Sequence, residues 1–304
     1  MKMKVFIAGQ EGMVGNAIYK LLKKKNFHLI DCKRSMLDLT SQQSVENFFK
    51  VHKPQIVINA AGKVGGILDN SKFQSDYLYI NSIIGLNLIH SSFKYNVKKL
   101  INLGSACIYP KSSKTPIKEE YLLTSELEKT NEGYALAKIL TLKYCSYLNK
   151  KFIKNFISLQ PANLYGERDN FDLNSSHVIP ALIRKFHEAK INNEKNVTVW
   201  GDGTPKREFL HVNDLANAIY YCLKKNIKHT YMNVGGKDYL SISKLSDIIK
   251  KITKFKGKVS FDKSYPNGVN KRNLDSSKIY KLGWRPKINL EKGLKTYYNY
   301  FLKL

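Results

Sequence analysis

The first strand of the chain runs directly into a glycine-rich turn. The apolar run KVFIA begins at Lys4, GQEGMVG follows it, and a helical pattern of apolar residues then continues to Leu22. In such a turn Gly9 permits the sharp bend, Gly12 lets the backbone approach a pyrophosphate, and Gly15 allows close packing of the helix. This order of strand, turn and helix predicts a dinucleotide-binding βαβ unit.

The rest of the first half alternates strands with helices. Further strands are predicted at 28–31, 56–59, 100–103 and 156–159, and helical patterns at 41–52, 77–95 and 134–150. Alternation of this kind predicts an α/β fold with a doubly wound parallel sheet. Ligands bind at the carboxyl ends of such strands, where Gly9, Ala60, Ser105 and Pro161 are expected.

The end of the second strand carries signals for both nicotinamide dinucleotides. Asp31 could accept a hydrogen bond from the 2′-hydroxyl of NAD, whereas Lys33 and Arg34 could neutralise the 2′-phosphate of NADP. The residues at this strand end are therefore compatible with either NAD or NADP.

A second constellation lies between LGSACIYP and EGYALAKI. Tyr134 and Lys138 stand four residues apart on a predicted helix and so share one face. A tyrosine with a pKa near 10 is a poor acid, and the Lys138 ammonium is expected to lower the pKa of Tyr134. Ser105, after a predicted strand, could hold a carbonyl oxygen. The three residues predict proton transfer to a ketone.

The chain of 304 residues has a net charge of +27, which raises the question of nucleic-acid binding. Its lysines are spread over nearly all predicted surface segments, and no nucleic-acid-binding motif is present. We therefore expect no nucleic-acid partner. A positive field of this kind suits a small polyanionic substrate instead.

The four cysteines, Cys32, Cys107, Cys145 and Cys222, are scattered without metal-ligand spacing or the density of a disulfide scaffold, so no metal site is expected. No apolar run approaches the roughly 20 residues that span a membrane, and the N-terminus has no signal-peptide pattern. These observations predict a cytoplasmic protein without a membrane partner.

The combination of the glycine turn, NAAGKVGG, Ser105 and Tyr134-x-x-x-Lys138 resembles the extended short-chain dehydrogenase/reductases. Longer strings, GMVG, KVGGI, CIYP, NLYG, SHVIPALIRKFHEA and TPKREFLHV, resemble the GDP-L-fucose synthase (GDP-4-keto-6-deoxy-D-mannose 3,5-epimerase-4-reductase) family over essentially the whole chain. The resemblance implies a Rossmann sheet, NADP(H) as cofactor with NAD(H) possible, a GDP-linked 4-keto-6-deoxy sugar as substrate, and a homodimer formed through the helices at 77–95 and 134–150.

The resemblance also implies cofactor contacts. They are expected at Gly9, Gln10, Gly12, Met13, Val14, Gly15, Arg34, Leu103, Gly104, Lys138, Pro161, Asn163, Leu164 and His177.

The second half is expected to hold the sugar nucleotide. By resemblance, a dinucleotide-binding domain covers 1–165, with a return segment near 208–236, and a smaller α/β substrate domain covers 166–207 and 237–304. Lys185, Trp200 and Arg207 match family positions that bind the nucleotide sugar, and Asn267 stands where an aspartate is usual. Arg207 offers a fork for diphosphate oxygens, and Trp200 a flat face or an indole donor.

The implied reaction is hydride transfer to C4, followed by protonation by Tyr134. The C4 ketone also acidifies the protons on C3 and C5, and Cys107 and His177 match the family residues that exchange them.

Departures from the family pattern leave alternatives open. Glu11 replaces a basic residue near the 2′-phosphate, and Ala106, Ala162 and Glu167 replace a serine, a threonine and a proline. A C4 reductase without epimerase activity, acting on a related GDP-4-keto-6-deoxy sugar such as a heptose, is one alternative. A nucleotide-sugar epimerase or dehydratase is another, although Ala106 and Cys107 do not supply a dehydratase acid/base pair. A non-catalytic nucleotide-sensing scaffold is the third, against which the intact Ser105, Tyr134 and Lys138 argue.

Overall fold

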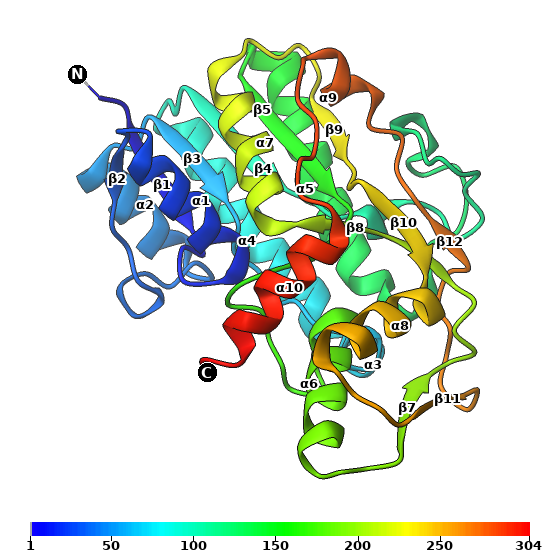
Figure 1. The fold of residues 1–304 in the computed structure, drawn as a ribbon. Coiled ribbons are helices and arrows are strands. Elements are labelled where there is room, and N and C mark those ends of the chain that lie inside the picture. The colour runs from blue at the N-terminus through cyan, green and yellow to red at the C-terminus, as the bar shows by residue number, and fades with distance from the viewer. Residues whose placement is uncertain (1) are drawn as a thin grey trace.

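A six-stranded parallel sheet forms the centre of the computed structural model, which describes residues 2–304 (Figure 1). The strands follow the spatial order β2-β1-β3-β4-β5-β9. They are β1 (Lys4–Ala8), β2 (His28–Ile30), β3 (Ile56–Asn59), β4 (Lys99–Leu103), β5 (Phe156–Pro161) and β9 (Tyr231–Val234). The chain reverses direction of winding between β1 and β3, so the predicted α/β, doubly wound parallel sheet is confirmed.

Helices cover both faces of this sheet because its strands are apolar on both sides. In β1, Val5 and Ile7 belong to the core beneath α1 (Met13–Lys24) and α7 (Val212–Lys224), whereas Phe6 and Ala8 belong to the core beneath α2 (Gln42–His52) and α4 (Gln74–Lys94). The helix α5 (Glu132–Phe152) packs along α4. Strands buried on two faces are typical of parallel sheets.

A second group of elements lies beyond the carboxyl edge of the main sheet (Figure 1). One small sheet contains β6 (Asn163–Tyr165), β8 (Lys206–His211), β10 (Asp238–Ser241) and β12 (Lys271–Arg272), and another pairs β7 (Asn196–Trp200) with β11 (Lys258–Asp262). The helices α6 (Val178–Ile191), α8 (Ile242–Thr253) and α10 (Leu290–Phe301) pack with them around a third hydrophobic cluster. None of the helices within residues 2–304 is long and apolar enough to cross a membrane.

Short elements make up the connections. They are α3 (Ile67–Lys72), α9 (Ser277–Lys281) and the 3₁₀ turns η1 (Arg34–Met36), η2 (Ala106–Ile108), η3 (Glu119–Tyr121) and η4 (Lys129–Asn131). The predicted helices over 77–95 and 134–150 are both present and begin earlier, at Gln74 and Glu132. The polar residues in these first turns carry no apolar period, which explains why the pattern missed them.

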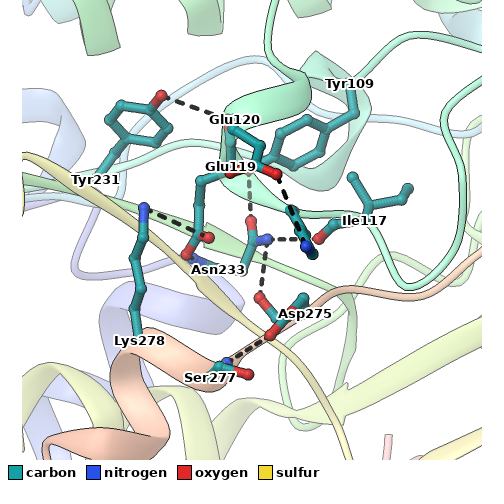
Figure 2. A network of polar contacts seen from close by, with 10 residues as sticks. Tyr109, Ile117, Glu119, Glu120, Tyr231, Asn233, Asp275, Ser277 and Lys278 are labelled. Carbon is teal, nitrogen blue, oxygen red and sulfur yellow. Dashed lines mark hydrogen bonds and ion pairs between the residues drawn. The ribbon is translucent and has the colours of Figure 1, made fainter.

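A buried polar network ties the segment after Cys107 to distant parts of the chain (Figure 2). Asn233 accepts a hydrogen bond from the Tyr109 hydroxyl at 2.6 Å, and its own backbone N–H donates to Glu119 at 3.0 Å. Its side-chain amide donates to the carbonyl oxygens of Ile117 and Asp275, at 2.9 and 3.1 Å. Because Asn233 is fully buried, losing any partner would leave a costly unsatisfied group.

Candidate active site

The glycine turn has the shape that a dinucleotide requires. Gly9 has φ +81°, and a Cβ there would lie 2.8 Å from the carbonyl oxygen of Ala60, while a Cβ on Gly15 would lie 2.0 Å from that of Gly9. At Gly12 the nearest atom would be 3.5 Å away, so this position is open on the protein side. The turn therefore presents bare backbone and the N-terminus of α1 to a ligand, which fits a pyrophosphate.

Next to this turn, two hydrogen bonds connect the glycine motif to the residues that follow β2. The Gln10 amide donates to Asp31 at 2.6 Å, and the Arg34 backbone N–H donates to the Glu11 carboxylate at 2.7 Å. Glu11 therefore lies beside Arg34, where its negative charge opposes a 2′-phosphate. Arg34 itself is exposed at the start of η1 and can still reach outward.

A cavity of about 470 Å³ opens at the carboxyl edge of the main sheet. All the side chains predicted to be catalytic line it: Ser105, Cys107, Tyr134, Lys138 and His177. Predicted cofactor contacts at Gly12, Met13, Val14, Leu103, Gly104, Pro161, Asn163 and Leu164 line it as well. The cavity is not lined by Gly9, Gln10 and Gly15 of the glycine turn, nor by Arg34 at the start of η1.

Burial controls the proton chemistry of Tyr134 and Lys138. The Lys138 ammonium donates to the carbonyl oxygen of Leu103 at 2.9 Å and lies 5.5 Å from the centre of the Tyr134 ring. Burial raises the pKa of Tyr134, opposed by the hydroxyl of Ser105, and burial lowers the pKa of Lys138 to about 8. The expected lowering of the Tyr134 pKa by Lys138 is outweighed by desolvation, and the phenol is protonated, as an acid must be.

Cys107 and His177 enter the cavity from different elements. The Cys107 sulfur accepts a hydrogen bond from the Asn131 amide at 3.5 Å, and the Cys107 backbone N–H donates to the Ser105 hydroxyl at 3.1 Å. His177 is the exposed N-cap residue of α6. Asp169 also lines the cavity, its Oδ2 atom is buried without a hydrogen-bond partner, and burial raises the pKa of its carboxyl against the charge of His177.

A second cavity of about 230 Å³ adjoins the first, and His177 and Arg207 line both. Its wall contains the predicted residues Lys185, Trp200 and Asn267. The Trp200 ring stacks on Tyr265 at 4.5 Å with an interplanar angle of 7°, and the Lys185 ammonium lies 4.8 Å from the Trp200 ring centre. Two neighbours thus fix the orientation of the indole.

Asn267 lines the smaller cavity and also makes two hydrogen bonds within the protein. Its side-chain oxygen accepts from the Asp202 backbone N–H at 3.0 Å, and its carbonyl oxygen accepts from Arg207 at 3.2 Å. Asn267 therefore helps to orient Arg207, and its predicted contact with the substrate stays a prediction.

Two guanidinium groups lie together where the cavities meet the small sheet. Arg272 pairs with Arg207 in the register of β12 and β8, and burial with the charge of Arg272 lowers the pKa of Arg207 to about 10. Arg272 is buried, lines the larger cavity, and has no hydrogen-bond partner at Nε and Nη2. Two guanidinium groups in one corner of the cavity attract an anion.

A loop from the second half reaches back to the glycine turn. Glu167 forms an ion pair with Lys20 of α1 at 2.8 Å, and the Arg168 guanidinium donates to the carbonyl oxygen of Glu11 at 3.2 Å. Arg168 also lines the larger cavity.

Sequence reasoning missed Asn131, Asp169, Arg168 and Arg272. Asn131 and Asp169 carry no motif of their own. The only signal for Arg168 and Arg272 is that arginine is rare in this chain, in which most basic residues are lysines.

A doubly wound sheet with a glycine turn after β1 and a Ser, Tyr and Lys set at its carboxyl edge defines a short-chain dehydrogenase/reductase type of oxidoreductase. Comparison with known proteins then narrows this class. A family model described as the NAD dependent epimerase/dehydratase family matches residues 5–235. A GDP-L-fucose synthase of Sinorhizobium fredii is 47% identical over 98% of this chain and 95% of its own length.

Two solved structures from Campylobacter jejuni are similar throughout. A GDP-6-OMe-4-keto-L-xylo-heptose reductase has 36% identity and a TM-score of 0.94, over 99% of this chain and 98% of that one. A GDP-mannoheptose C4 reductase with NADP bound has 37% identity and a TM-score of 0.91, with the same coverage. The chain therefore belongs to the NAD dependent epimerase/dehydratase family, in the branch that contains the GDP-L-fucose synthases, and the predicted resemblance is confirmed.

Proposed function

We propose that the protein reduces C4 of a GDP-linked 4-keto-6-deoxy sugar with NADPH and epimerises C3 and C5 in the same cavity, as a GDP-L-fucose synthase does. The observation that carries this proposal is the meeting of Ser105, Tyr134, Lys138, Cys107 and His177 in one cavity beside the glycine turn. The names of the relatives, GDP-L-fucose synthases and GDP-heptose reductases, support the same substrate class.

In the reduction, NADPH supplies the hydride when it is bound. Ser105 holds the C4 oxygen by a hydrogen bond, and Tyr134 donates its proton to that oxygen as negative charge develops there. Burial favours the protonated phenol before the reaction. Lys138, anchored on Leu103, supplies a positive charge beside the phenolate that forms.

In the epimerisation, one group must remove a proton and another must return it to the opposite face of the sugar. Cys107 and His177 supply a thiol and an imidazole from separate elements of the cavity. Asn131 holds the Cys107 sulfur in place, and the nearby Asp169 carboxylate balances the charge of a protonated His177.

The arginine pair gives the substrate class its physical basis. Arg207 and Arg272 together supply two charges and unpartnered donors, which suits the two phosphates of GDP. The smaller cavity beside them, with Trp200 and Lys185 in its wall, offers a flat aromatic face and an ammonium group to the nucleoside.

A second candidate is C4 reduction alone, on a GDP-4-keto-6-deoxy heptose. It is supported by the likeness to the two heptose reductases, and in that case Cys107 and His177 serve as binding residues. The epimerase or dehydratase alternative and the nucleotide-sensing scaffold have no comparable support.

We also propose that the protein forms a homodimer through α4 and α5. Large apolar side chains are exposed on both helices: Leu78, Tyr79, Leu136, Leu140 and Tyr147. Exposed apolar side chains on two adjacent helices are typical of a protein interface. A cytoplasmic location and the division into domains at 165, 207 and 236 remain predictions of the sequence.

The test is to present a panel of GDP-4-keto-6-deoxy hexoses and heptoses with NADPH and identify each product by NMR. We expect a 4-hydroxy product with inverted C3 and C5. Reduction without inversion would leave the second candidate, and no reduction of any member would refute both.

A further inference from the structure

The glycine turn receives a contact from a segment far away in the chain. Arg168, 157 residues after Glu11 in the sequence, donates from Nη1 to the carbonyl oxygen of Glu11 at 3.2 Å. Arg168 belongs to the loop that follows β6, and the next residue, Asp169, already lines the larger cavity together with it. The loop therefore crosses the cofactor end of that cavity.

From this placement we infer that Arg168 closes over the pyrophosphate of the bound dinucleotide and holds it against the N-terminus of α1. The inference rests on the proposed use of NADPH. It assigns a cofactor-binding residue outside the glycine motif, supplied by the half of the chain that carries the sugar site.

The wall of the cavity favours the pyrophosphate over the 2′-phosphate as the partner of Arg168. The lining residues on this side are Gly12, the N-cap residue, and Met13 and Val14 in the first turn of α1. The Gly12 N–H donates to the carbonyl oxygen of Gly9 at 3.1 Å, whereas the N–H groups of Met13 and Val14 have no partners within the helix. That turn contains no acidic residue and no side-chain cap. By contrast, Asp31 and Arg34, at the end of β2, do not line the cavity.

The guanidinium of Arg168 has capacity for a ligand. It is exposed, and within residues 2–304 its contact with Glu11 is a single hydrogen bond, without an ion pair. A guanidinium has five N–H donors in a planar fork that matches phosphate oxygens. A dinucleotide between this fork and the helix N-terminus would be bound by charge from two sides.

The backbone of Arg168 decides which replacement leaves the turn intact. Arg168 has φ +67°, in a turn where the Asp169 N–H donates to the carbonyl oxygen of Gly166 at 3.3 Å. Glycine or asparagine adopts this conformation with less strain than arginine. Asparagine is therefore the replacement that removes the guanidinium without adding strain to the turn.

The experiment measures dinucleotide binding without sugar, by the fluorescence of the reduced nicotinamide. In Arg168→Asn, the Kd of NADPH and the Kd of NADH should both rise by about tenfold or more, and by the same factor. The Tm of the ligand-free variant should equal or exceed that of the parent protein, because asparagine relieves the strain. If Arg168 had only a structural role, its replacement would not weaken dinucleotide binding while leaving the Tm unchanged or higher.

Two control variants distinguish a contact with the pyrophosphate from a contact with the 2′-phosphate. Arg34→Gln should raise the Kd of NADPH and leave that of NADH unchanged. Lys20→Gln removes one positive charge and the ion pair to Glu167 but does not line the cavity, and it should change neither Kd by more than about twofold. As a probe, 2′-AMP carries the 2′-phosphate without a pyrophosphate, and its affinity should be equal in Arg168→Asn and the parent protein.

Equal dinucleotide affinity in Arg168→Asn and the parent would overturn the inference. So would a loss confined to NADPH and 2′-AMP, which would assign Arg168 to the 2′-phosphate. The binding measurement contains no sugar, so its result does not depend on whether the protein reduces a 4-keto sugar. Failure of this inference can therefore be distinguished from failure of the proposed reaction.

Discussion

Arg272 lies directly across from Arg207, in the paired register of β12 and β8, and two nitrogen atoms of its buried guanidinium have no protein partner. Two like charges at this spacing repel each other, and the unpartnered donors add a desolvation cost. The structure therefore carries an unfavourable arrangement that an anionic ligand would relieve.

Replacing Arg272 by methionine should consequently separate stability from binding. Arg272→Met is expected to raise the free energy of unfolding without ligand by about 1 kcal/mol, and to raise KM for the GDP-sugar by about tenfold or more. Chemical denaturation and steady-state kinetics measure the two effects. A variant that is destabilised, with KM unchanged, would show that Arg272 has a structural partner instead.

The proton donor is tested by Tyr134→Phe, which removes the phenolic hydroxyl and keeps the ring against Tyr77. We expect kcat for C4 reduction to fall by about 10²- to 10⁴-fold, while the Kd of NADPH changes little. The matched control is Tyr79→Phe on α4, which also removes one phenolic hydroxyl but lines neither cavity, so kcat should not change. Turnover of Tyr134→Phe at the parent rate would exclude Tyr134 as the acid.

Epimerisation is tested by solvent exchange. In D2O the parent enzyme should incorporate deuterium at C3 and C5, and Cys107→Ser or His177→Asn should suppress the exchange, while C4 reduction of a substrate that is already epimerised continues. Mass spectrometry and NMR follow both outcomes. Reduction by the parent enzyme without any deuterium uptake would assign Cys107 and His177 to binding alone.

A buried carboxyl group predicts a dependence of stability on pH. Burial raises the pKa of Glu208 from 4.5 to about 7, although its carboxylate accepts from the Leu274 N–H at 2.8 Å. Between these two pKa values the folded state holds a proton on Glu208 that the unfolded chain has released. The contribution of this proton to the free energy of unfolding is present at acidic pH and is lost as pH rises through about 7. The loss is about 3 kcal/mol at most.

Urea titrations of the parent protein and Glu208→Gln between pH 4 and 8 check this prediction. The difference between the two free energies of unfolding should change in favour of the variant as pH rises. A difference that is constant across this range would mean that Glu208 titrates normally.

The proposed dimer predicts a change in mass. Leu136→Glu with Leu140→Glu places two charges on the exposed face of α5 and should convert a dimer to a monomer of about 34.9 kDa, measured by light scattering. Leu302→Glu, at an exposed position outside both helices, is the control. A parent protein that is monomeric at all concentrations would contradict the proposal.

The sheet and its ligand edge were predictable because they depend on local patterns. Gly9 and Gly15 are tightly constrained by contacts within the turn and with the adjacent strand, and Ser105 follows β4 directly, so short strings of residues contain the information. Tyr134 and Lys138 likewise share one helix.

The remaining features depend on contacts between distant segments. Nothing near Arg168 in the sequence indicates that it reaches Glu11, and Arg272 acquires its meaning only when β12 pairs with β8. The expected lowering of the Tyr134 pKa was wrong in direction, because the expectation used the spacing on the helix without the burial of the phenol.

The network around Asn233 also couples the segment after Cys107 to the way the chain folds. Its partners extend from Tyr109 to Asp275, which are far apart in the sequence. Contacts of such large sequence separation require the closure of long loops and make folding slower. The segment that follows Cys107 can therefore complete its buried hydrogen bonds only after the segment around Asp275 has docked beside Asn233.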